Sequence, residues 1–164
     1  MLDQKFLNEL QQYVEHYLNF VSMEVFQEAE YKDREIFETI QGYELEDFIK
    51  TNRKPSFHHM LFHLIDHKGM SDTAIYKKAG IDRRHFSKIR SNPDYRPRKN
   101  TVIALTFALE LNKKETDKLL NSAGYSLSES ETFDLVIRFC LEKKMYNLFL
   151  VNEALDYFGL KPIV

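Results

Sequence analysis

A run of basic residues between Arg83 and Lys99 has the clearest chemical meaning in the sequence. Seven of these residues are Lys or Arg, and Asp94 is the single acidic residue among them. The seven are Arg83, Arg84, Lys88, Arg90, Arg96, Arg98 and Lys99. Guanidinium and ammonium groups bind phosphates, and Arg can pair with guanine through two hydrogen bonds. Contact with nucleic acid is therefore one interpretation, and a solvated face or a surface that docks an acidic protein are the alternatives.

Three histidines offer a second kind of chemistry. His59, His63 and His67 are four residues apart and share one face of an expected helix. Two histidines at this spacing can share a zinc ion. No cysteine is near them in sequence and Asp66 is the only close carboxylate, so we expect a histidine-rich surface without a metal.

Other signatures of catalysis are missing from the sequence. It contains no Gly-rich phosphate loop, no zinc-protease motif and no serine motif of the kind that marks a hydrolase. The carboxylates of residues 24–47 fall on polar faces of amphipathic segments. We therefore expect a protein that is not an enzyme and that needs no cofactor.

Charge is unevenly distributed along the chain, whose net charge is only -2. Residues 1–50 carry 4 Lys or Arg and 12 Asp or Glu, whereas residues 51–124 carry 15 and 7. Residues 125–164 carry 4 and 6. The basic middle indicates a local site for a polyanion. It also allows the acidic N-terminal segment to dock on the basic face and mask it.

Composition predicts a mostly helical protein of the cytosol. Apolar residues make up 43% of the chain, enough for a core, and Gly and Pro are few. The single cysteine, Cys140, excludes an internal disulfide framework and is expected to be a small core residue. The start lacks the pattern of a signal peptide, and no stretch is apolar enough to span a membrane.

The first basic residues fall on an expected helix whose boundaries are well marked. Ser71 is predicted to cap a helix over 72–79, Gly80 to turn the chain, and Asp82 to cap a helix over 83–91. Inside this unit Ile75, Ala79, Phe86 and Ile89 are expected to face the core. Arg83, Arg84, Ser87, Lys88 and Arg90 then face outward.

The flanking elements are also predicted to be helices. The expected ranges are 4–27, 33–50, 57–68 capped by Ser56, 101–111, 114–123, 130–143 and 147–158. The broad apolar face of 4–27 fits internal packing and a dimer interface equally well. The expected organisation is an acidic helical region at 1–54, a central domain at 55–124 and a C-terminal helical hairpin at 125–164.

On these motifs, residues 57–120 resemble the Cro/repressor (XRE-like) family of helix-turn-helix DNA-binding domains. The resemblance implies an all-α, five-helix domain, a function in transcription regulation, and a homodimer on DNA. It places Arg83, Arg84 and Lys88 on base edges. The residues expected on the DNA backbone are Ser71, Ser87, Arg90, Arg96, Arg98 and Lys99.

Some positions depart from the family pattern. Asp72 replaces the usual phosphate-binding Gln, Tyr76 replaces a small residue, and the loop with Pro93, Tyr95 and Pro97 is longer. This region is also similar to a variant module at the C-terminus of bacterial macro-domain proteins. The alternative function is therefore a protein-interaction module that keeps the fold without reading DNA, with Tyr95 and its loop as recognition features.

Overall fold

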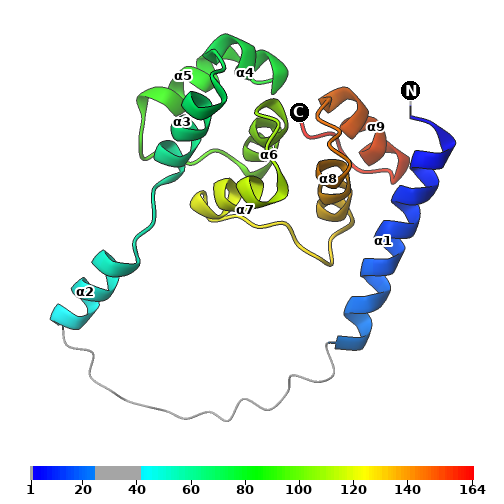
Figure 1. Cartoon of the computed structure of the whole chain (residues 1–164), viewed down its shortest axis with the longest axis horizontal. Helices are drawn as coiled ribbons and strands as arrows, with labels where there is room; N and C mark the ends of the chain where they lie inside the picture. Colours follow the sequence, from blue (N-terminus) through cyan, green and yellow to red (C-terminus); the bar gives the residue numbers. More distant parts are fainter. Residues whose placement is uncertain (1, 25–41) are drawn as a thin grey trace.

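The computed structural model describes residues 2–24 and 42–164, and within these residues all regular structure is helical (Figure 1). The helices are α1 (Gln4–Glu24), α2 (Gly42–Asn52), α3 (Phe57–Lys68), α4 (Asp72–Lys78), α5 (Arg83–Ser91), α6 (Lys99–Ala108), α7 (Lys113–Ser122), α8 (Thr132–Glu142) and α9 (Leu148–Tyr157). The predicted all-α class is confirmed. None of these helices combines the length and hydropathy needed to cross a bilayer.

Most helix boundaries follow from local capping, as the sequence predicts. The Ser56 hydroxyl accepts a hydrogen bond from the His59 amide at the start of α3, and Gly69 ends that helix with a φ of 63°. Helix α6 begins two residues before the predicted Thr101, because Arg98 already has the extended backbone of an N-cap. Residues 25–27 and 33–41 of the predicted helices lie outside the described residues.

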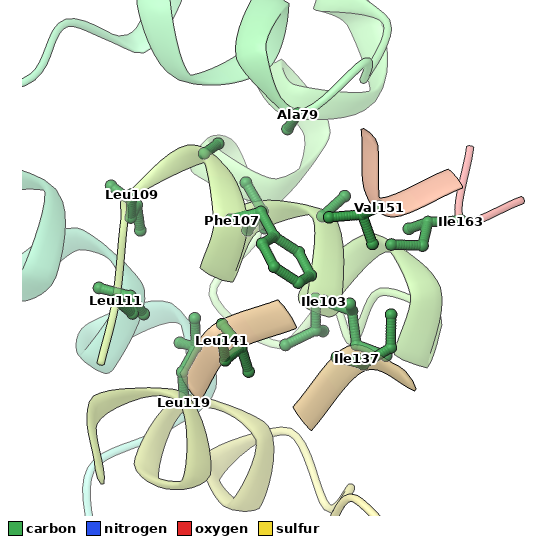
Figure 2. Packing of buried hydrophobic residues seen from close by; sticks show 14 of the residues in the cluster. Ala79, Ile103, Phe107, Leu109, Leu111, Leu119, Ile137, Leu141, Val151 and Ile163 are labelled. Atoms are coloured by element: carbon green, nitrogen blue, oxygen red, sulfur yellow. The ribbon is translucent and has the colours of Figure 1, made fainter. Parts of the chain in front are cut away.

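The core is centred on α6, whose residues from Val102 to Ala108 are all buried. In Figure 2, Phe107 of α6 lies among Ala79, which directly follows α4, and side chains of α8 and α9 that include Ile137 and Val151. The C-terminal helices thus share one continuous apolar core with α3–α7. The division of the chain into three domains stays a prediction.

Cys140 belongs to this core, on α8. It is fully buried, and burial raises the pKa of its thiol from 9.0 to about 12. The thiol is therefore un-ionised at neutral pH, as expected of a small core residue.

Helix α1 packs on α8 through an aromatic contact. The Phe139 ring lies 5.3 Å from the Phe6 ring and 5.0 Å from the Tyr13 ring, between ring centroids. At one edge Lys143 donates to the Glu9 carboxylate at 2.5 Å, and this contact lowers the pKa of Glu9. The apolar face of the predicted 4–27 helix could pack internally or form a dimer interface. The structure shows internal packing for the part that carries Phe6 and Tyr13.

Candidate nucleic-acid interface

Helices α4 and α5 are joined by a short turn that is fixed by backbone hydrogen bonds. The Ser71 hydroxyl accepts from the Ala74 amide at 3.2 Å to start α4. Gly80 has a φ of 63°, and the Ile81 amide donates back to the Tyr76 carbonyl at 2.9 Å. This is the Schellman pattern, which needs a left-handed residue such as glycine. The Asp82 carboxylate then accepts from the Arg84 amide at 2.7 Å and starts α5.

The inner face of this unit anchors α5 to the core. Ile75, Ala79, Phe86 and Ile89 are all buried, as predicted. Tyr76, which departs from the family pattern, is half-buried and lies against Phe86 with ring centroids 6.0 Å apart. The larger residue is therefore accommodated by an aromatic contact with α5.

The outer face of α5 presents two arginines, Arg83 and Arg84, that have no partner among the described residues. Arg83, Arg84, Ser87 and Lys88 are exposed, and no carboxylate of residues 2–24 or 42–164 pairs with either arginine. Both arginines lie in the first turn of α5, which holds no acidic side chain. The amide groups at a helix N-terminus carry partial positive charge, and the two arginines outnumber the one capping carboxylate of Asp82, so this turn favours a further anionic partner.

Lys88, the third residue predicted to read bases, is held against the loop that follows α5. Its ammonium lies 4.3 Å from the centre of the Tyr95 ring. The Tyr95 hydroxyl is in turn 3.1 Å from Nε2 of His85. Tyr95 is therefore packed onto α5 by both its ring and its hydroxyl, and its predicted role as a recognition feature stays a prediction.

Arg90 of α5 forms an ion pair with Asp72 of α4. Its guanidinium donates to the Asp72 carboxylate at 2.5 Å and lies 4.1 Å from the Phe62 ring centre. The carboxylate of Asp72, the second departure from the family, is thus paired. Beside this ion pair is a cleft of about 380 Å³ lined by Asp72, Thr73, Tyr76, Arg83, Phe86, Ser87 and Arg90.

The other residues predicted on a DNA backbone are spread over different contacts. The exposed Ser71 is used as the cap of α4. Arg96 lies over the turn at Gly124, where a Cβ on the glycine would be 3.4 Å from Nη1 of Arg96. Arg98 is exposed at the start of α6.

Lys99 is occupied by a structural contact instead. Its ammonium donates at 2.6 Å to Asp134, which is 2% exposed on α8, and the same carboxylate oxygen accepts from the Ser128 amide at 2.7 Å. Because this ammonium already neutralises a buried carboxylate, Lys99 ties α6 to α8.

The three histidines lie on α3 and face α7. They form one side of a groove of about 390 Å³ lined by Pro55, His59, Met60, His63, Leu64, His67, Glu115 and Lys118. Among the described residues, no three His, Cys, Asp or Glu side chains are grouped so as to hold a metal ion.

The described acidic helices leave the outer face of α5 open. Helix α1 packs on α8, far from α5 in Figure 1, and its Glu9 is paired with Lys143. Helix α2 buries none of its residues. In this structure neither of these helices masks Arg83 or Arg84.

Comparison with protein-family models, with curated proteins and with solved structures gives no match for this chain.

Proposed function

We propose that the chain is a DNA-binding transcription regulator in which α4 and α5 act as a helix-turn-helix. Helix α5 would enter the major groove with its N-terminal turn toward the bases, and Arg83 and Arg84 would read base edges. The observation that carries the proposal is the pair of unpartnered arginines on the exposed first turn of a helix that Phe86 and Ile89 anchor in the core.

Rigidity supports this role as much as charge does. Two caps, a Schellman turn and buried residues of α5 fix where its first turn points. Base reading needs side chains that start from a defined backbone position, whereas non-specific attraction needs charge alone.

The paired state of Asp72 removes an electrostatic objection to DNA at this face. A free carboxylate at the start of α4 would repel a phosphate beside the helix N-terminus. The Arg90 guanidinium at 2.5 Å balances that charge, so the first turn of α5 keeps a net positive charge from Arg83 and Arg84 against the single carboxylate of Asp82.

The roles of the other cations follow from their contacts. The Lys88 ammonium would lose only its cation–π contact with the Tyr95 ring if the side chain extended toward a base or phosphate. Exposed Arg98 is the best candidate for a backbone contact outside α5. Lys99 is left out of the proposed interface, because moving it would strand the carboxylate of Asp134.

Titration of the full chain with labelled genomic DNA fragments, at low and at high salt, tests the proposal. Fluorescence anisotropy should show binding at low salt that weakens steeply as salt rises, and some fragments should bind far more tightly than others. Absence of binding at low salt would overturn DNA binding, and equally weak binding of every fragment would overturn sequence reading.

A further inference from the structure

Helix α2 exposes an apolar face that nothing among the described residues covers. Leu45, Phe48 and Ile49 are all exposed, and their spacing places them on one side of the helix. Glu44 and Glu46 fall on the two edges of that side. Among the described residues, this amphipathic helix with acidic edges has no packing partner for its apolar side.

The groove between α3 and α7 has complementary chemistry. Its apolar lining comes from exposed Pro55, half-buried Met60 and the edge of Leu64, while the exposed His63 supplies a hydrogen-bonding ring and Lys118 a positive charge. The carboxylate of Glu115 in this groove already has partners within the fold. It accepts a hydrogen bond from the Asn112 amide at 3.0 Å and lies 3.6 Å from the Lys68 ammonium. The histidine row from His59 to His67 extends about 12 Å along α3, slightly more than two helical turns.

The connection between α2 and α3 keeps this helix away from the groove of its own chain. Folding back would require a tight reversal between Arg53 and Ser56. Pro55 restricts Lys54 to extended backbone, and Ser56 is itself extended with φ −65° and ψ 163°. Figure 1 accordingly shows α2 projecting away from the helices that follow it.

From these two surfaces we propose a symmetric dimer in which α2 of each copy lies in the α3–α7 groove of the other. The Leu45, Phe48 and Ile49 face covers Met60 and Leu64, and the acidic edges lie beside the histidines and Lys118. Reciprocal exchange closes the assembly with two identical contacts. The inference does not rest on DNA binding, since the groove and the outer face of α5 have no residue in common.

Sedimentation equilibrium of the full chain tests the dimer, with Phe48→Glu as the disrupting variant. The substitution should raise the dimer dissociation constant about thirtyfold or more, as expected for a central aromatic residue of an interface. Phe149→Glu is a matched control, because Phe149 is 66% exposed on α9 and Phe48 is 64% exposed on α2. A chain that is monomeric throughout the micromolar range, or equal dimers in all three proteins, would overturn the proposal.

Mixing two defective variants tests the exchange itself. Phe48→Glu places a charge on the apolar face of α2, and His63→Glu places one in the groove. Each variant alone should be folded by circular dichroism and monomeric by sedimentation. A mixture of the two should form a heterodimer that keeps one intact contact, seen as co-sedimentation of differently labelled chains. If no heterodimer forms, α2 either binds its own groove or a different partner, and the proposed exchange is wrong.

Discussion

Among the described residues, three cations around α8 are paired with carboxylates, whereas two arginines in the first turn of α5 are not. Around α8, Lys143 is paired with Glu9, Arg138 with Glu129 and Lys99 with Asp134, at 2.5, 2.9 and 2.6 Å. On α5, Arg83 and Arg84 have no such partner among the described residues. The contrast is between cations that carboxylates of the fold hold in place around α8 and two adjacent guanidinium groups on α5 that no described carboxylate holds. The ion pairs at α8 are therefore structural, and the proposed anion site at α5 uses cations that the described part of the fold leaves unpaired.

The largest effect is expected where a cation of the α8 region is paired with a buried carboxylate. Asp134→Ala removes the partner of Lys99 and the acceptor of the Ser128 amide, so we expect a loss of about 3 kcal/mol in the free energy of unfolding. Chemical denaturation measures this loss.

Asp134→Asn is the control for that experiment, because an amide oxygen can still accept from Ser128 while the charge is lost. Its cost should be clearly smaller than that of the alanine variant. A loss under about 0.5 kcal/mol for Asp134→Ala, the range of ordinary surface changes, would show that the α8 ion pair is not structural.

On α5 the corresponding change should alter binding rather than folding. Arg84→Ala is expected to cost about 1–3 kcal/mol of affinity for the preferred DNA and to relax the sequence preference. Arg98→Ala should weaken binding to every sequence to a similar degree and reduce the salt dependence by about one phosphate contact. Competition titrations with preferred and random duplexes compare the two variants, and identical behaviour would contradict the assignment of base reading to Arg84.

The smallest effect concerns the electrostatic cost of the unpaired arginines. Because the N-terminus of α5 is positive, Arg83→Gln should stabilise the free protein by about 0.3–1 kcal/mol. Lys77→Gln, in the last turn of α4 where a cation is favourable, should have the opposite sign. Urea denaturation at low salt resolves the two, and a destabilising Arg83→Gln would indicate that Arg83 is satisfied within the fold.

Local signals in the sequence predicted much of the fold and the turn between α4 and α5. Ser71, Gly80 and Asp82 act within a few residues of themselves, so their caps and turn could be predicted without knowledge of the rest. The apolar spacing of Phe86 and Ile89 likewise predicted which face of α5 is buried.

Contacts between distant residues could not be predicted in this way. Asp72 pairs with Arg90, and Lys99 with Asp134, across 18 and 35 residues, and no local pattern marks either pair. For this reason Lys99 looked equivalent to Arg98 in the sequence. Similarly, the stripe on α1 is apolar whether it packs on α8 or on another chain, and only the structure shows its contact with Phe139.

The most direct test of the account is to map where DNA contacts the chain. Backbone and arginine side-chain NMR signals of labelled protein would be followed during titration with a preferred duplex. We predict large shifts confined to the start of α4, the turn at Gly80 and the first turns of α5, with the Arg83 and Arg84 side chains most affected and α8 near Lys143 unchanged. Shifts centred on α8, or a silent α5 in the presence of bound DNA, would contradict the account.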